Sequence, residues 1–130
     1  MPGVQLKILF HAATNVAAHV YEHPKAGSWT ELVTRYIDGL NVTLTDLRDT
    51  GVTAPPWVKT TRVSGGSTDQ MFKEHTSQRD RNGIRTISSA DTVREFEDGY
   101  ARYMAWKSGV GMSADEVARV SRMRTAAPKQ

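Results

Sequence analysis

Apolar and polar residues alternate at the start of the chain. Residues 4–8, with the sequence VQLKI, show the two-residue period of a half-buried β-strand. Alanine, the best helix former, dominates residues 12–18, so we expect a short helix over residues 13–22. Pro24 ends this helix, because a proline disfavours helical backbone at the residue before it.

The longest helical pattern runs over residues 28–51. Ser28 and Glu31 have the spacing of a capping box, in which both side chains accept hydrogen bonds from backbone amides at the start of a helix. Apolar residues then recur at intervals of four, three, four and three, and form a seam that consists of Val33, Ile37, Leu40, Leu44 and Leu47. Residues 41–45 also alternate as a strand would, and Gly39 could break the helix before them, but we favour one helix, bent if necessary.

The middle of the chain predicts shorter elements. Residues 57–63 are rich in threonine and valine and follow a stiff Ala-Pro-Pro segment, which indicates an edge strand. Ser67 and Gln70 have the spacing of a second capping box, at the start of a short helix. The Asn-Gly pair at 82–83 is a strong turn signal, and residues 84–87 predict a short strand.

A second strong helix begins at Ser88 or Ser89. Its aromatic rings could stack on single-stranded nucleic-acid bases, but their spacing within an apolar arc favours the protein core. We expect the seam of residues 28–51 to pack against this arc rather than against a second copy of the chain. A third capping box, at residues 113–116, begins a last helix. The arc consists of Val93, Phe96, Tyr100, Tyr103 and Met104, with Trp106 at its margin.

These elements predict a single α+β domain in which helices are the majority, with a small sheet of two or three short strands. An all-α fold is the alternative. The length of 130 residues is that of one domain, which we expect to span residues 1–116. Residues 117–130 then form the last helix, which runs into a basic, frayed C-terminal tail. The chain has no stretch of ~20 apolar residues, so we expect no membrane span.

The charge of the protein is concentrated near its C-terminal end. The chain has 17 basic and 14 acidic residues, and four of the basic ones lie in residues 117–130, which have no acidic residue. The remainder therefore has 13 basic and 14 acidic residues and is about neutral. A polar loop over residues 73–85 adds a second group of cations. Together these cations predict a surface for nucleic acid or an acidic protein, formed by Lys73, Arg79, Arg81, Arg85, Arg119, Arg122, Arg124 and Lys129.

Two features resemble chemical sites without completing one. Residues 19–23 match the H-x-x-E-H zinc-protease pattern, but Pro24 moves His23 off helical geometry, so we expect no metal site. We assign no role to the four histidines, His11, His19, His23 and His75. Residues 64–68, with the sequence SGGST, lack the Lys-Ser/Thr pair of a phosphate-binding loop, and we interpret them as a flexible turn. The absence of cysteine excludes disulfides and thiolate sites.

No complete catalytic motif is present, so we expect a protein without enzymatic activity and without a cofactor. The basic loop and tail indicate a small regulatory or accessory protein that binds nucleic acid or a nucleic-acid-handling complex. The alternative is a structural or assembly subunit, for example of a phage-like particle, that self-associates into a homo-oligomer through amphipathic helices. Trp57 and Trp106 lie at the margins of the apolar pattern and are our candidates for an interface. The N-terminus shows no export signal, so we expect a cytoplasmic protein, or a virion-associated one if the alternative holds.

Overall fold

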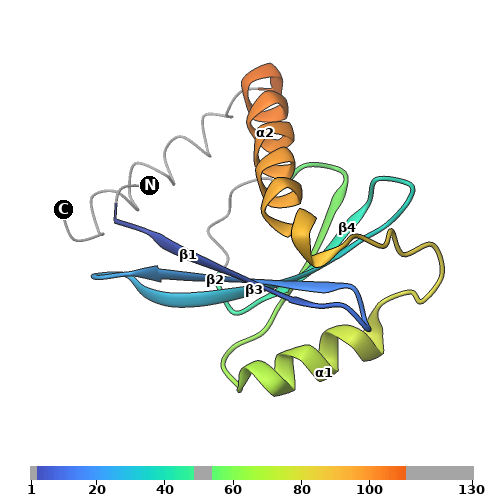
Figure 1. Cartoon of the computed structure of the whole chain (residues 1–130). Helices are drawn as coiled ribbons and strands as arrows, with labels where there is room; N and C mark the ends of the chain where they lie inside the picture. The colour runs from blue at the N-terminus through green and yellow to red at the C-terminus, as the bar shows by residue number, and fades with distance from the viewer. Residues whose placement is uncertain (1–2, 49–53, 111–130) are drawn as a thin grey trace.

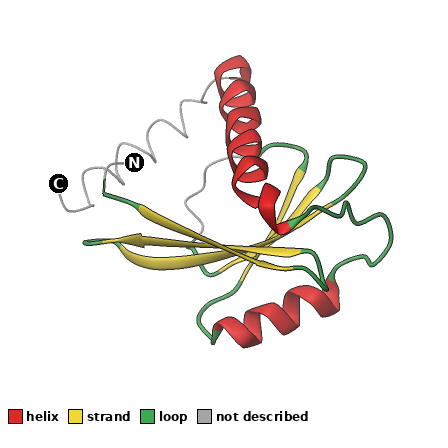
Figure 2. Cartoon of the chain, viewed as in Figure 1, coloured by secondary structure: helices red, strands yellow, loops and turns green. Residues whose placement is uncertain are grey.

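A twisted five-stranded sheet forms the middle layer of the protein, and one helix lies on each of its faces (Figure 1). The structure is a computed structural model, and it describes residues 3–48 and 54–110. Strands and helices are coloured separately in Figure 2, which shows the sheet between the two helices. The elements are β1 (Gln5–His11), β2 (Val16–His23), β3 (Gly27–Arg35), β4 (Asn41–Thr45), β5 (Val58–Arg62), α1 (Thr68–Gln78), a short 3-10 helix η1 (Ser89–Asp91) and α2 (Thr92–Val110).

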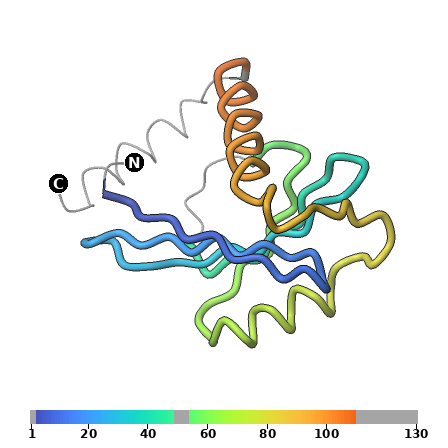
Figure 3. Tube along the Cα trace, in the orientation of Figure 1, coloured from blue at the N-terminus to red at the C-terminus, as the bar shows by residue number. Residues whose placement is uncertain are grey.

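The strands lie in the sheet in the order in which they occur along the chain. Strands β1 to β4 form an antiparallel meander, whereas β5 joins the edge parallel to β4. The turn between β3 and β4 contains Asp38 and Gly39, and Gly39 has a φ of +93°, a left-handed conformation that glycine adopts without strain. Figure 3 follows the meander along the Cα trace.

The face of the sheet under α1 holds the apolar core. Ala18, Leu32 and Leu44 are aligned across three neighbouring strands. Leu32, Leu44 and Val16 are buried together with Met71, which α1 contributes. Helix α1 begins at the capping box predicted from the sequence: Ser67 Oγ accepts from the Gln70 amide, and Gln70 Oε1 accepts from the Ser67 amide. This cap directs the helix so that Met71 points into the core.

The C-terminal end of α1 is tied to the sheet by a chain of buried hydrogen bonds. Arg79 Nη1 donates to the Thr34 hydroxyl at 3.0 Å and to the Thr14 carbonyl at 2.6 Å. Thr34 Oγ1 also shares a hydrogen bond with His75 Nε2, 2.7 Å away. Burial, and secondarily the Arg79 charge, lowers the pKa of His75 to about 4. His75 is therefore neutral at physiological pH.

The helix-majority fold and the small sheet predicted from the sequence are wrong, and so is the all-α alternative. The chain is α+β with strands in the majority. Residues 13–22 form most of β2 rather than a helix, and residues 28–51 contain β3 and β4 rather than one helix. In β3 the α1 face carries the polar Thr34 as well as Leu32, and the opposite face carries the apolar Val33 as well as Glu31, so the sequence lacks the alternation that identifies a half-buried strand. Tertiary pairing then overrides the helix propensity of alanine.

The predicted seam of residues 28–51 does not exist in the structure. Leu44 is buried, whereas Ile37 is 74% exposed in the turn after β3. Self-association through amphipathic helices was predicted from this seam. It stays a prediction, but the seam no longer supports it.

Other predictions from the sequence are confirmed. The first strand is present as β1, residues 57–63 contain the edge strand β5, and helices begin after Ser67 and after Ser88. Residues 84–87 make only an isolated bridge, between Ile84 and Tyr36. The last predicted helix and most of the predicted basic tail lie outside the described residues. Neither described helix is long and apolar enough to cross a membrane.

The burial of Leu44 and the exposure of Ile37 predict that truncation of the two side chains has different effects on stability. Leu44→Ala should lower the free energy of unfolding by about 2–5 kcal/mol, because it opens a cavity in the α1 face. Ile37→Ala should change it by less than about 0.5 kcal/mol, because the Ile37 side chain is exposed. Urea denaturation of both variants checks this. Equal losses would contradict the strand assignment, because a helical seam would bury both residues.

The His75 site predicts a pH dependence of stability. The folded pKa, about 4, lies below the ordinary value of 6.5, so the unfolded chain binds a proton first as the pH falls. Stability should therefore decrease between pH 6.5 and pH 4, by at most roughly 3 kcal/mol from this residue. Urea midpoints across this range should fall less steeply in His75→Gln. Parallel curves for the two proteins would show that His75 is not held neutral.

Candidate functional site

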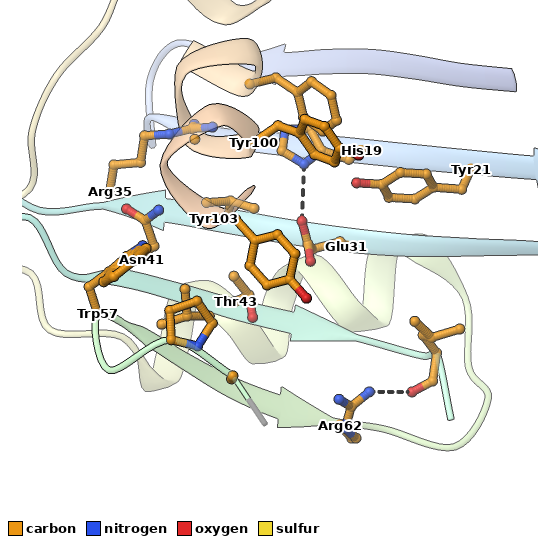
Figure 4. Close-up of a pocket in the computed structure, with 17 residues that line it drawn as sticks. His19, Tyr21, Glu31, Arg35, Asn41, Thr43, Trp57, Arg62, Tyr100 and Tyr103 are labelled. Atoms are coloured by element: carbon orange, nitrogen blue, oxygen red, sulfur yellow. Dashed lines mark hydrogen bonds and ion pairs between the residues drawn. The ribbon is translucent and has the colours of Figure 1, made fainter. Parts of the chain in front are cut away.

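An open cleft lies between the other face of the sheet and helix α2 (Figure 4). Its volume is about 540 Å³, within the range of sites that hold a small molecule or a single nucleotide. Side chains from β2, β3 and β4 form the floor, α2 forms the roof, and the segment 54–62 closes the third side. This face differs from the α1 face, because its floor contains charged and hydrogen-bonding groups.

The roof of the cleft contains aromatic rings and a glycine. Phe96, Tyr100 and Tyr103 line the cleft from α2, and Tyr100 is 58% exposed. Gly99 lies among them, in the interior of the helix, where glycine is less favourable than alanine by about 1 kcal/mol. A Cβ atom on Gly99 would have no neighbour within 4 Å. Packing therefore does not require this glycine, and its absent side chain leaves the cleft wider.

Helix α2 is held over the sheet by the carboxylate of Glu95. Arg85 donates two hydrogen bonds to it, with Nη1–Oε1 and Nη2–Oε2 distances of 2.7 and 2.6 Å. The buried guanidinium of Arg35 on β3 lies 3.8 Å from the same carboxylate. The hydrogen bonds from Arg85 lower the pKa of Glu95, and burial lowers the pKa of Arg35. One carboxylate thus joins α2 to β3 and to the segment before η1.

The floor of the cleft contains a buried histidine paired with a glutamate. His19 on β2 is 3% exposed, and its Nδ1 lies 3.1 Å from Oε1 of Glu31 on β3 (Figure 4). The Nε2 atom of His19 is buried and has no hydrogen-bond partner within the part of the chain that the structure describes. The side chain of Glu31 is 33% exposed, and among the described residues its Oε2 has no hydrogen-bond partner. The floor therefore presents a positioned carboxylate to the cleft.

Aromatic rings surround this pair. Phe96 packs edge-on against His19, with ring centroids 4.9 Å apart, and Tyr21 stacks on Trp29 at 5.2 Å. Burial, and secondarily Glu31, raises the pKa of the Tyr21 hydroxyl, which stays protonated and can donate a hydrogen bond.

The two tryptophans predicted from the sequence as interface residues lie together at one end of the cleft. Trp57 and Trp106 make an edge-to-face contact with centroids 6.2 Å apart, and Tyr103 lies 6.1 Å from Trp106. The guanidinium of Arg102 lies 4.0 Å above the Trp57 ring and donates to the Gly39 carbonyl. We call Trp57, Tyr103 and Trp106 the aromatic cluster. Whether it is an interface stays a prediction.

The segments that form this end of the cleft are positively charged. Residues 54–68 and 99–110 contain no aspartate or glutamate. Arg102 covers Trp57, and the ammonium group of Lys107 lies 5.7 Å from the Trp106 ring centroid. Cations therefore lie against the aromatic rings at this end, and Arg62 lines the cleft at the other end of β5 (Figure 4).

The loop predicted over residues 73–85 is wrong in its first part, because residues 73–78 belong to α1, and the structure divides the four cations of this segment. Lys73 and Arg81 are exposed. Arg79 and Arg85 are engaged within the protein, Arg79 with Thr34 and Arg85 with Glu95. The predicted cations Arg119, Arg122, Arg124 and Lys129 lie outside the described residues. The loop as a nucleic-acid contact stays a prediction.

The residues of the H-x-x-E-H pattern lie on strand β2 and not on a helix. His23 Nδ1 accepts hydrogen bonds from the amides of Lys25 and Ala26, so it stabilises the turn between β2 and β3. The residues that the structure describes contain no group of three or more side chains placed to hold a metal ion.

Sequence reasoning missed the floor of the cleft. His19, Tyr21 and Glu31 were assigned to helices, and only their strand register brings them together: His19 pairs with Glu31, and Tyr21 with Trp29. The Asp38-Gly39 pair, a hairpin signal, could have revealed that β3 and β4 are strands.

The chain shows no significant similarity to known proteins. No family model matches it, and no curated protein or solved structure matches it significantly.

The open space at Gly99 predicts the effect of adding a methyl group. Gly99→Ala should raise the free energy of unfolding by roughly 0.5–1 kcal/mol, because alanine favours helix and meets no obstacle. Gly27→Ala is the matched control: its Cβ position is also open, but its φ of +84° is unfavourable for alanine, so it should destabilise. Thermal or urea denaturation compares them. A loss of stability in Gly99→Ala would contradict the open roof.

Proposed function

We propose that the protein binds single-stranded nucleic acid in the cleft between the sheet and α2. The observation that carries this proposal is an open cleft of nucleotide size that is lined by aromatic side chains and has cations at both ends. Proteins that bind single strands combine aromatic surfaces for the bases with cations for the backbone phosphates.

The aromatic residues provide the stacking surfaces. Tyr100 is exposed at the roof, and the Trp57 ring lines the cleft beneath Arg102. Stacking of a base on such a ring contributes about 1–3 kcal/mol and tolerates any sequence, because every base has a π-face. We infer that one base enters the cleft and that a neighbouring base stacks on the exposed part of the aromatic cluster.

The cations provide contacts for phosphates. The side chain of Arg62 is exposed, and among the described residues only its Nη1 donates hydrogen bonds, to the carbonyls of Leu47 and Arg48. Its remaining donors favour a phosphate at its end of the cleft, and the positive charge of Arg102 favours a second phosphate at the end where Trp57 lies. Lys73 and Arg81, together with the predicted basic tail, extend this surface if the strand continues beyond the cleft.

The concave shape of the cleft favours a single strand over a duplex. A base enters a pocket of this kind only when it is unstacked and unpaired, which costs free energy in a duplex and little in a single strand. The proposed role is therefore that of a non-enzymatic regulatory or accessory protein. We propose that it acts in the cytoplasm, where single strands arise during the handling of nucleic acid.

The proposal predicts binding of a labelled single-stranded 12-mer that contains all four bases, measured by fluorescence anisotropy. If Arg62, Arg102 and Lys107 neutralise three phosphates, log affinity should fall with log salt at a slope of roughly −2. Tyr100→Ala should raise the Kd by roughly 5- to 150-fold through the loss of one stacking surface. Val93→Ala, on the same helix and similarly exposed but outside the cleft lining, should leave the Kd unchanged.

A second pair of variants tests whether the base enters the cleft. Gly99→Leu should fill the roof and abolish tight binding, whereas Ala101→Leu, at an exposed position on the same helix, should not. Absence of binding at 50 mM salt would contradict the proposal. A Kd that is the same for the wild type, Tyr100→Ala and Gly99→Leu would also contradict it. If only substitutions of Lys73, Arg81 or the basic tail weaken binding, nucleic acid binds elsewhere on the protein.

A further inference from the structure

We propose that the floor of the cleft selects guanine, through two hydrogen bonds from the base to the carboxylate of Glu31. This inference rests on the proposed function and specifies which base the cleft accepts. It is carried by the geometry of the His19–Glu31 pair and by the hydrogen-bonding pattern of the four bases.

The carboxylate of Glu31 is held in place by a buried histidine on the neighbouring strand. His19 is buried on the neighbouring strand and directly opposite Glu31, and its Nδ1 contacts Oε1. This contact limits rotation of the glutamate side chain without using its other oxygen. Among the described residues Oε2 has no partner, and the side chain is one-third exposed to the cleft. A carboxylate oxygen accepts two hydrogen bonds, so Oε1 also retains one acceptor site.

Two parallel acceptor oxygens match one base better than the others. Guanine presents a ring N–H next to an exocyclic amino group, and these two donors form parallel hydrogen bonds to a carboxylate. Adenine and cytosine present an amino group beside an unprotonated ring nitrogen, whose lone pair would oppose the second oxygen. Thymine and uracil present their ring N–H between two carbonyl oxygens, which the carboxylate repels. The floor therefore favours guanine by attraction and disfavours the other bases by repulsion.

Other groups of the cleft are compatible with a guanine ring. The roof residues Phe96 and Tyr100 provide aromatic surface for its faces. The positive charge of Arg62 at the cleft offsets the repulsion between Glu31 and the phosphate of the bound nucleotide.

The test compares labelled single-stranded thymidine 11-mers that carry one central substitution. The substituted nucleotides are deoxyguanosine, deoxyinosine, deoxyadenosine and deoxycytidine. We expect the guanine oligomer to bind at least about tenfold more tightly than the inosine oligomer, because hypoxanthine lacks only the exocyclic amino group and so loses one charge-assisted hydrogen bond. The adenine, cytosine and unsubstituted oligomers should bind no more tightly than the inosine oligomer.

Two variants locate the selectivity. Glu31→Gln should remove the preference for guanine and bind the thymidine oligomer more tightly than the wild type does, because the charge that attracts guanine and repels thymine is lost while the stacking surfaces remain. Tyr100→Ala is the matched control, and should weaken all five oligomers by the same factor and keep the preference. Thermal denaturation confirms that each variant is folded, and the comparison of guanine with inosine on the wild type requires no variant.

The outcomes separate the inference from the proposed function. Binding that depends on Tyr100 but is equal for all five oligomers would overturn the selection of guanine and leave single-strand binding in place. A preference for guanine that persists in Glu31→Gln would overturn the assignment to this carboxylate. Failure of every oligomer to bind at 50 mM salt would overturn both.

Discussion

The Glu95 carboxylate is the interaction on which the candidate site depends. It accepts two hydrogen bonds from Arg85 and lies near the buried guanidinium of Arg35, so it fixes the first half of α2 above β3. A buried arginine without a nearby carboxylate would be costly, and this cost makes the position of α2 specific. Glu95 lies in the first turn of α2, and the later residues Phe96, Gly99, Tyr100 and Tyr103 line the cleft.

The two faces of the sheet have different roles. On the α1 face, Leu32 and Leu44 pack against Met71 and close the core. On the α2 face, the same strands present His19 and Glu31, whose hydrogen-bonding capacity is only partly satisfied. Apolar burial on one face provides stability, which allows the other face to keep an open, polar floor. Because these strands pack into the core on one face, the side chains on their other face are held in fixed positions, which suits a binding site.

The sequence allowed prediction of the elements whose signals are local. The capping box at Ser67 specifies the start of α1 through two hydrogen bonds between neighbouring residues, and the alternation of residues 4–8 predicts β1. Strands β2 and β3 could not be assigned in this way, because apolar and polar residues do not alternate cleanly along them and the alanines of β2 favour a helix. The cleft floor was missed with them, since His19 and Glu31 meet only through strand register. Trp57 and Trp106 were identified individually, but not as neighbours.

The central claim is that the α2 face of the sheet binds nucleic acid while the α1 face only stabilises the fold. Titration of ¹⁵N-labelled protein with a single-stranded oligonucleotide, followed by NMR, tests it directly, since at 14.4 kDa each backbone amide is observable. Our account predicts shifts at Glu31, Gly99 and Tyr100, with the amides of Leu44 and Met71 unchanged. Shifts confined to residues 73–85 and 117–130, or no shifts at saturating oligonucleotide, would contradict it.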